Sequence, residues 1–525
     1  MNEFIMQRLL TLILFAPVVG MVAVMLVPSE RKQAVRWVSL VASLVPFGLS
    51  VLLWVNFDNG ATGFQFEERA EWYTVIRSSY HLGVDGISVP MILLTTLLTP
   101  LGILTSFGIQ DRVKAYMLLF LMLETGMLGV FMALDLILFF LFWEIGLVPM
   151  YFLISVWGSP KGEREFGSGK RVSARYYASY KFFVYTLGGS LGLLLAIQIL
   201  GLVGGSFDLI ILLDKWPNFS GELFANIPTS AVRSAAFWAF VLAFAIKVPL
   251  WPFHTWLPDA HTEAPTAGSM ILAGVLLKLG AYGFLRLVLP LFPQEAHDAA
   301  PVLAFLAMAA IVLGALSAYG QSDFKRLVAY SSVNHMGFVV LGIAAAAWVA
   351  GSSDAGMRLS GTLATTGVVL QMFNHGLSAA AMFFLVGVVY DRVHTRDLDE
   401  LGGGIWQLAP AYGGILIFSS MASLGLPGLN GFVSEFAIVR GAWPIFSAVT
   451  AVSMVGLFFT GAYILKGIRQ VLHGPRNEKW SHHEMEVTTR EKVIVAPLML
   501  LMLIIGLWPW WITSVINETA KSLIG

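Results

Sequence analysis

Hydrophobic segments long enough to cross a lipid bilayer recur along nearly the whole chain, and they restrict its possible folds more than any other feature. A bilayer core requires about 20 apolar residues per helix, and within lipid the backbone must be paired inside helices or a closed barrel. The sequence therefore predicts an all-α polytopic membrane protein with about 14 transmembrane helices. The expected segments are 6–27, 36–55, 88–110, 115–134, 135–157, 175–204, 234–257, 267–289, 301–320, 325–349, 362–389, 410–440, 446–472 and 493–515.

The composition of the 525-residue chain agrees with a membrane location and excludes several function classes. Charged residues make up 12% and the mean hydropathy is +0.76, whereas soluble domains carry about 25% charged residues. The formal net charge of zero gives no reason to expect a nucleic-acid partner. The chain contains no cysteine, so it cannot supply thiolate ligands to an iron–sulfur cluster or a zinc site.

The distribution of Lys and Arg predicts the orientation of the chain in the membrane. About three fifths of the 32 basic residues fall in loops that follow odd-numbered segments, and little more than a quarter in the other loops and the termini. Because basic loops stay cytoplasmic, we expect the odd-numbered loops on that side and both termini on the other. No small-residue cleavage site follows the first apolar run, Leu9 to Val27, so we interpret it as a retained span.

Two of the expected helices are interrupted. The seventh contains Lys247-Val248-Pro249, and the twelfth contains Gly425-Leu426-Pro427-Gly428. Proline removes a backbone donor and clashes with the preceding turn, and broken backbone at membrane depth occurs only beside protein or water. The breaks lie five spans apart, so their helices run in opposite directions, as in an inverted repeat with a polar site at its interface.

This pattern predicts four parts of the chain. We expect helices 1–3 with an extramembrane loop in 1–114, a first five-helix repeat in 115–289, a second in 301–472 and a last helix in 473–525. Within the first part, 56–87 is the longest linker, and we expect it to form a small extramembrane hairpin or loop.

Ionisable residues inside the apolar segments are the main indication of function. A charge at bilayer depth costs at least ~2.5–3.5 kcal/mol on insertion scales, so such residues usually face a protein interior or a wet path. They correspond by position between the two expected repeats. The corresponding pairs are Glu144 with His335, Lys181 with His375, Lys247 with Glu435 and, loosely, Lys278 with Lys466.

These residue types can carry protons along a chain. Burial disfavours the charged form of an acid or a base, and a nearby opposite charge favours it. A Glu144–Lys247 pair whose separation changes would therefore act as a switch that releases a proton toward Lys278. Imidazole titrates near neutral pH, so His335 and His375 suit onward relay, with Glu435 as the terminal carboxylate.

Each residue also has a structural interpretation. Lysine or glutamate could form a locked ion pair between helices, the histidines could be satisfied core residues, and Lys466 could extend to the interface. Glu124 and Lys181 fit either interpretation. The stretch from His254 to Glu263 superficially resembles a metal site, but its ligand spacing is loose, so we interpret it as a re-entrant loop.

Several segments closely resemble one family. FFLFWEIGLVPMYFLI (139–154), the stretch KVPLWPFHTWLPDAHTEAPTAGSMILAGVLLKLGAYG (247–283), SDFKRLVAYSSVNHMGF (322–338), HGLSAAAMFFLVGVVYDRVHTRD (375–397) and GLPGLNGFVSEF (425–436) are similar to the antiporter-like proton-pumping subunits of NADH–quinone oxidoreductase, respiratory complex I. Subunits of multisubunit cation/proton antiporters and of membrane-bound hydrogenases belong to the same superfamily.

The resemblance implies a 14-helix fold with two inverted five-helix repeats, and a site formed by matching positions. Those positions are Glu144, Lys247, Lys278, His335, His375 and Glu435. Glu435 corresponds to a position where most branches of the family carry lysine and one carries glutamate. The subunit implied is a non-redox part of an H⁺-translocating oxidoreductase.

The resemblance also implies the surroundings of the chain. NADH, FMN, iron–sulfur clusters and quinone would be bound by other subunits, with no cofactor or metal in this chain. The expected partners are protons, the lipid bilayer, neighbouring antiporter-like chains and the lateral helix of chain L, in a bacterial plasma membrane or a thylakoid-type membrane. A cation/proton antiporter subunit, a hydrogenase subunit and a structural spacer of the membrane arm are the alternatives.

Overall fold

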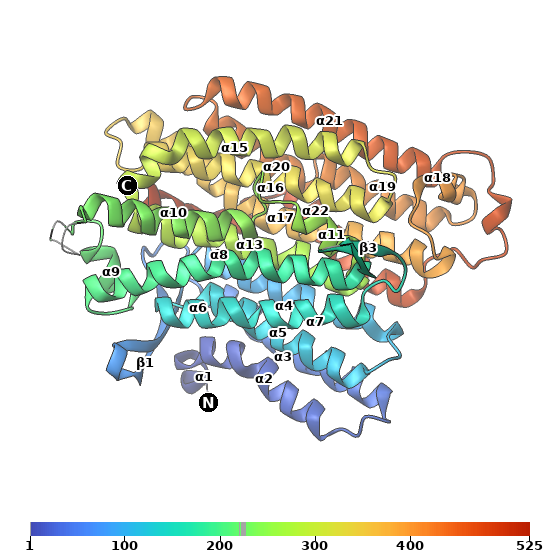
Figure 1. Ribbon diagram of the computed structural model, residues 1–525, viewed down its shortest axis with the longest axis horizontal. Helices are drawn as coiled ribbons and strands as arrows, with labels where there is room; N and C mark the ends of the chain where they lie inside the picture. The colour runs from blue at the N-terminus through green and yellow to red at the C-terminus, as the bar shows by residue number, and fades with distance from the viewer. Residues whose placement is uncertain (1, 168, 220, 222–226) are drawn as a thin grey trace.

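The chain folds into a bundle of long helices that run along a common direction (Figure 1). The structure is a computed structural model, and it describes residues 2–167, 169–219, 221 and 227–525. Within these residues, 12 helices are long and apolar enough to cross a membrane. They are α2 (Leu9–Leu26), α3 (Lys32–Asn56), α4 with η2 (Ser88–Gly108), α5 (Val113–Met132), α6 and α7 (Leu136–Trp157), α8 (Ala174–Gly204), α10 (Thr229–Lys247), α12 to α14 (Thr266–Leu291), α15 (Pro293–Tyr319), α16 (Phe324–Val349), α17 (Ala355–Val393) and α21 (Ser447–Leu472).

The two remaining predicted segments are helical but divided. In the twelfth segment, α19 (Pro410–Leu424) and α20 (Asn430–Ala442) are each shorter than a full span. In the last, α22 (Thr489–Leu507) and α23 (Trp510–Ile524) meet at a bend of 68° and count as one span at most. The polytopic helical fold is thus confirmed, while the count of fourteen and the inverted repeats stay predictions.

Short elements connect the long helices. The helical ones are α1 (Asn2–Gln7), η1 (Thr74–Ile76), α9 (Leu209–Lys215), α11 (Trp256–Glu263), α18 (Leu398–Leu401), η5 (Ile405–Gln407) and η6 (Glu478–Trp480). An antiparallel hairpin of β1 (Gln65–Tyr73) and β2 (Ser78–Val84) confirms the fold expected for the long linker. A second hairpin, β3 (Glu163–Phe166) with β4 (Lys170–Ser173), was not predicted, because its strands are only four residues long.

The central helices hold the core. In the most apolar 18-residue stretch of α12 to α14 and of α17, 100% of the residues are buried, and in that of α16 94% are buried. In the corresponding stretches of α2 and α3, only 39% and 28% are buried. Because a helix enclosed on all sides contacts protein and not lipid, it can carry polar residues that face its neighbours. The predicted site residues Lys278, His335 and His375 lie on these three helices.

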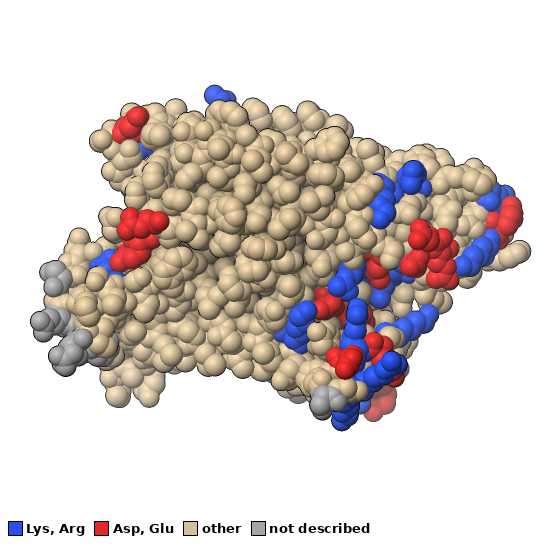
Figure 2. All heavy atoms as spheres, turned by 45° about the horizontal axis from the view of Figure 1, so that its top comes forward, with Lys and Arg blue, Asp and Glu red and all other residues tan. Residues whose placement is uncertain are grey.

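Charged side chains gather at one end of the bundle, and a broad uncharged belt covers the middle (Figure 2). The charged end includes the β3–β4 hairpin and the region of α18 (Figure 1), which belong to loops after odd-numbered predicted segments. Both termini lie toward the opposite end. This arrangement agrees with the orientation expected from the basic residues, since the basic loops share one side.

The β1–β2 hairpin is fastened to the bundle through His81. Its Nδ1 lies 2.9 Å from Oδ2 of Asp208, and its Nε2 lies 3.1 Å from Oε2 of Glu67. Arg69 also pairs with Asp208, at 3.0 Å. Burial by itself lowers the pKa of His81, but the hydrogen bonds and charges of Asp208 and Glu67 outweigh it, so the pKa is raised above its usual range.

We expect the fastening of this hairpin to weaken as the pH rises. A raised pKa means that the stabilisation is complete below the unfolded value of ~6.5 and is lost as the pH rises through the folded value. The protection factors of the β1–β2 amides, which compare their exchange with that of an unfolded peptide at the same pH, should therefore fall as the pH rises through this range. His81→Gln should remove the pH dependence and cost about 1–3 kcal/mol of local stability, because it takes the charged donor of the imidazolium away from the buried carboxylate of Asp208.

His482→Gln is the matched control, because His482 is exposed. The control should keep the pH dependence of the parent protein. Equal protection factors at all pH values in the parent would show that His81 does not carry the charge that fastens the hairpin.

Candidate proton-transfer site

The first helix interruption is confirmed and places Lys247 at a helix end. Lys247 is the last residue of α10, and α11 begins at Trp256 after an irregular stretch that contains Pro249 and Pro252. The indole Nε1 of Trp256 donates to the carbonyl of Ile246 at 2.9 Å. The broken backbone is thereby capped by protein, as a non-helical segment at membrane depth requires.

The second interruption is also confirmed and places Glu435 in the half-helix that follows it. α19 ends at Leu424, and α20 begins at Asn430. Gly425 and Gly428 adopt positive φ values of 83° and 92°, which residues other than glycine seldom adopt. A Cβ atom at Gly425 would lie 3.4 Å from Oε2 of Glu435, so the backbone of this turn lies close to the carboxylate.

Lys278 lies between two π-helical segments. They are η3 (Leu272–Leu276) and η4 (Phe284–Val288), and they flank α13 (Leu277–Gly283). A π segment leaves some backbone carbonyls without their usual partners and often marks a functional position. The ammonium of Lys278 donates to the carbonyl of Ala273 in the first of these segments.

The four side chains predicted to form the later part of the proton path lie close together. Nζ of Lys278 lies 2.7 Å from Nδ1 of His375, and Nδ1 of His335 lies 2.8 Å from Oε1 of Glu435. Between them, the rings of His375 and His335 are 5.6 Å apart. Each of the four side chains is at least 95% buried. They form one row across α13, α17, α16 and α20.

A close helix contact makes the first of these bonds possible. A Cβ atom at Gly376, next to His375, would lie 2.9 Å from the carbonyl oxygen of Gly274. Any larger residue at 376 would separate α17 from η3. The small residues therefore bring the imidazole of His375 within reach of Lys278.

Polar residues around Glu435 extend the site beyond the predicted set. Nε2 of Gln371 donates to Oε1 of Glu435 at 3.0 Å. Nε2 of His335 lies 3.2 Å from Oγ of Ser423 and 3.3 Å from the hydroxyl of Tyr463. The sequence did offer one indication of Gln371, because it precedes His375 by four residues and so shares its face of the helix. Ser423 and Tyr463 come from other helices, and only the tertiary structure identifies them.

Glu144 and Lys247 lie near each other but make no ion pair within 4.0 Å. The ammonium of Lys247 lies 5.2 Å from the ring centroid of Trp143, the neighbour of Glu144, and 5.9 Å from that of Phe182. Such cation–π contacts partly replace the lost solvation of a buried cation. Oε1 of Glu144 is buried without a hydrogen-bond partner.

Helix α11 is held by charges from several helices. The carboxylate of Asp259 forms ion pairs with Lys181 of α8 at 2.7 Å and with Arg326 of α16 at 3.3 Å. The ammonium of Lys325 donates to the carbonyl of Ala264 at 2.5 Å, and Arg396 donates to that of Thr262. Lys181, for which the sequence left two interpretations open, is thus an ion-pair partner of α11 in this structure.

The other undecided residues have distinct surroundings. Lys466 donates to the carbonyls of Tyr319 and Gln321, at 2.7 and 2.8 Å, which caps the end of α15. Glu124 is fully buried, and neither carboxylate oxygen has a hydrogen-bond partner. The ring of His261 stacks on Phe383 at 4.4 Å, and both of its nitrogens lack partners. His261 also lies within electrostatic range of Lys278 and Lys325.

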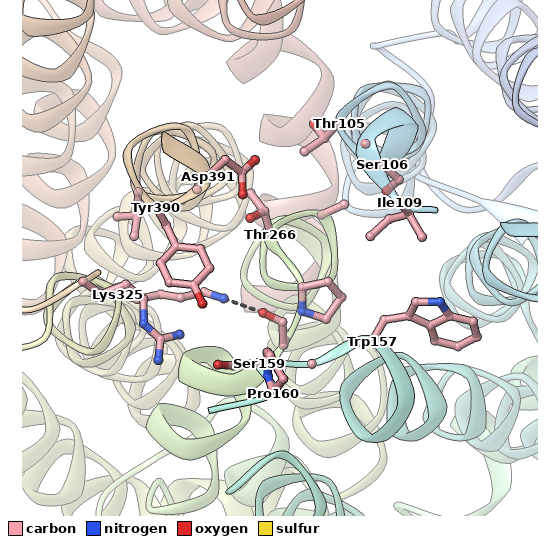
Figure 3. Close-up of a pocket in the computed structure, with 18 of the residues that line it drawn as sticks. Thr105, Ser106, Ile109, Trp157, Ser159, Pro160, Thr266, Lys325, Tyr390 and Asp391 are labelled. Atoms are coloured by element: carbon pink, nitrogen blue, oxygen red, sulfur yellow. Dashed lines mark hydrogen bonds between the residues drawn. The ribbon is translucent and has the colours of Figure 1, made fainter. Parts of the chain in front are cut away.

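A polar cavity of about 330 Å³ opens beside this region (Figure 3). Its lining includes Ser159, Thr266, Lys325, Tyr390 and Asp391, which come from both expected repeats. The hydrogen bond from Lys325 to Ala264 crosses the cavity wall. The cavity belongs to the end of the bundle that carries the charged loops, since it borders the stretches that follow α7 and α17.

Comparison with known proteins agrees with the polytopic helical fold. Residues 133–460 match the family described as NADH:quinone oxidoreductase/Mrp antiporter, TM. The chain is 40% identical to NADH-quinone oxidoreductase subunit M of Rhodobacter capsulatus, covering 99% of this chain and 97% of the relative. It is 37% identical to NAD(P)H-quinone oxidoreductase chain 4 2 of Thermosynechococcus vestitus, covering 98% and 91%.

Solved structures give the same fold. A chain of respiratory complex I from Thermus thermophilus with bound NADH superimposes with a TM-score of 0.82 at 26% identity, covering 98% of this chain and 100% of that one. A chain of the Mrp complex from Dietzia sp. DQ12-45-1b superimposes with a TM-score of 0.78 at 23% identity, covering 98% and 52%, and this likeness concerns the fold alone.

These features define an antiporter-like membrane subunit. The chain belongs to the NADH:quinone oxidoreductase/Mrp antiporter family and, within it, to the subunit M group of NADH-quinone oxidoreductases. The family resemblance predicted from the sequence is confirmed. Among the described residues, no group of three or more His, Asp or Glu side chains is placed to hold a metal ion.

We expect Gly280 to be essential for the contact between α10 and α13. A Cβ atom there would lie 2.8 Å from the carbonyl oxygen of Phe244 and 3.0 Å from Cβ of Lys247. Gly280→Val should push Lys247 away from the helix of Lys278, at a cost of about 1–3 kcal/mol for overpacking. The rate of proton translocation by the assembled complex should fall by a larger fraction than its melting temperature does.

Gly188→Val provides the comparison for this substitution. Gly188 also lies within a helix, but nothing is within 4 Å of its added Cβ. The control should translocate protons normally. Normal translocation by the Gly280 variant would show that the close approach of Lys247 to α13 is dispensable.

Proposed function

We propose that this chain translocates protons across the membrane as a non-redox subunit of the membrane arm of an NADH–quinone oxidoreductase. One observation carries the proposal: Lys278, His375, His335 and Glu435 form a buried row with contacts of 2.7 and 2.8 Å at its two ends. Ionisable groups at membrane depth are costly and usually serve a path for ions or protons. Four of them in succession support transport more than a locked ion pair.

Each contact in the row can pass a proton. Loss of a proton from the Lys278 ammonium to Nδ1 of His375 forms an imidazolium, whose other nitrogen, Nε2, makes no hydrogen bond in the structure. The next step crosses the 5.6 Å between the two imidazole rings, and it requires ring rotation or one bridging water. His335 then delivers the proton to Glu435 through the 2.8 Å contact at Nδ1.

The pair of Glu144 and Lys247 supplies a switch in this proposal. Two unit charges interact by about 4 kcal/mol at 4 Å with an effective dielectric constant of 20, and by about half as much at 8 Å. A movement of this size changes the equilibrium for proton release by roughly thirtyfold. Lys247 is the last residue of α10, next to the break. A small movement of the backbone at the break therefore changes the distance between Lys247 and Glu144.

The polar cavity beside Lys325 is the proposed entrance. It lies against the stretch that joins α11 to α12, the helical segment that leads toward Lys278. His261 lies within electrostatic range of both Lys325 and Lys278. Because both of its ring nitrogens lack protein partners, transfer from the cavity to the row through this side chain requires bridging water. The cavity is at the charged end, which we expect to be cytoplasmic.

The driving reaction takes place in other subunits. NADH oxidation and quinone reduction would occur where FMN, iron–sulfur clusters and quinone are bound, and reach this chain as a movement or a change of charge. The neighbours that transmit it would be other antiporter-like chains and the lateral helix of chain L. The complex would reside in a bacterial plasma membrane or a thylakoid-type membrane.

We expect Lys278→Met to remove the proton translocation that depends on this chain. The substitution keeps the length of the side chain and removes its only proton-carrying group. In vesicles containing the whole complex, the number of protons moved per NADH should fall, while the complex stays assembled. Lys466→Met is the matched control, because Lys466 binds two carbonyls at a helix end and should not affect the ratio.

The same vesicles separate the competing functions. An unchanged proton ratio in assembled Lys278→Met and Glu435→Gln complexes would favour a structural spacer. Replacing all Na⁺ and K⁺ by choline should leave the parent activity intact, whereas a cation/proton antiporter would stop. A hydrogenase subunit would instead assemble with soluble partners that do not oxidise NADH.

A further inference from the structure

Helices α2 and α3 lie at the edge of the bundle (Figure 1). An apolar groove runs between them. Its volume is about 660 Å³. The floor is made of small residues, because α2 and α3 cross where a Cβ atom at Gly20 would lie 2.4 Å from that of Ala42. Larger side chains, including Val19, Val41 and Trp37, form the walls and are more than half exposed.

One end of the groove carries a cluster of positive charge. Five basic and two acidic side chains lie in residues 27–37 and 109–114, just beyond the groove residues Ala23 and Trp37. Hydrogen bonds hold the cluster together: Lys114 donates to the carbonyls of Met25 and Val27, at 2.7 and 2.9 Å, and Lys32 to that of Gln110, at 2.8 Å. Arg112 is exposed.

The other end of the groove is closed by the β1–β2 hairpin. The hydroxyl of Thr11, the groove residue at this end, donates to Glu68 at 2.5 Å and lies 2.7 Å from the hydroxyl of Tyr80. The ring of Phe15 packs against that of Tyr80 at 6.4 Å. From Thr11 to Ala23, a helix rises about 18 Å at 1.5 Å per residue, which slightly exceeds the ~15 Å depth of one leaflet.

We infer that this groove binds one acyl chain of an anionic phospholipid, with the phosphate held by the basic cluster. Charge complementarity selects this occupant: an apolar channel ends in an excess of cations, with an indole at the boundary. Tryptophan favours that position because its ring is apolar and its N–H is polar. A second transmembrane helix would gain nothing from the cluster unless it carried acidic residues at the same level. The lipid site is separate from the proposed proton path.

Native mass spectrometry of the detergent-purified full chain tests the inference. The probes are phosphatidylglycerol and phosphatidylcholine with identical acyl chains. We expect the chain to retain phosphatidylglycerol at least tenfold better. Lys32→Gln with Arg112→Gln should reduce this retention about thirtyfold, since each basic residue near an anionic surface contributes roughly fivefold. Lys492→Gln, an exposed basic residue elsewhere at this end, should have no effect.

A second pair of variants tests the acyl groove itself. Val19→Trp fills the groove and should abolish retention of both lipids, whereas Val22→Trp, one turn away, exposed and outside the groove, should not. Melting temperatures equal to that of the parent establish that the variants are folded. Equal retention of both lipids by the parent would overturn the selection of an anionic headgroup by the basic cluster. In the whole complex purified in detergent, loss of a neighbouring subunit in Val19→Trp without any change in lipid retention would overturn the lipid assignment in favour of a helix-docking face.

Discussion

The cost of placing ionisable groups at bilayer depth governs the architecture of this protein. Lys278, His335, His375 and Glu435 are almost fully buried, and each one has a polar partner within hydrogen-bond distance. Regular helices cannot supply such partners to one another unless their axes approach closely or their backbones open. The chain uses both solutions, because Gly376 meets Gly274 and π-helical turns flank Lys278.

The broken helices are the second consequence of this cost. At the first break, Lys247 ends a helix beside aromatic rings, and at the second, Gly425 of the turn lies close to Glu435. Helix α11, which follows the first break, is tied through Asp259 to Lys181 and Arg326 on two different helices. An element held by ion pairs on both sides moves with either of its neighbours. In the proposed mechanism, this is how a displacement elsewhere reaches the Glu144–Lys247 pair.

The surface divides into parts with different chemistry. The charged loops occupy one end (Figure 2), and the His81 contact fastens a hairpin toward the other. Between them, the hydrophobic stretches of the central helices are enclosed almost completely, whereas peripheral helices such as α2 and α3 expose large apolar areas. The proposed lipid groove on α2 and α3 is thus separated in space from the proposed proton path in the central helices.

The sequence by itself determined the class of fold, the broken helices and the ionisable residues. Hydrophobic length and the conformational limits of proline and glycine are local properties, and charges inside apolar segments stand out without any structure. Only the tertiary structure decided which of these residues meet. The row from Lys278 to Glu435 crosses four helices, Ser423 and Tyr463 complete the surroundings of His335, and Lys181 pairs with Asp259.

Neither the register between helices nor the direction of a side chain can be read from the periodicity of a helix that is buried on every side. In α17, all residues of the most apolar stretch are buried, so the hydrophobicity pattern does not show which face of the helix meets which neighbour. Contacts of small residues such as Gly376 and Gly280 set the distances instead. Those contacts depend on the packing of segments that are far apart in the chain, which is why the tertiary structure alone decided them.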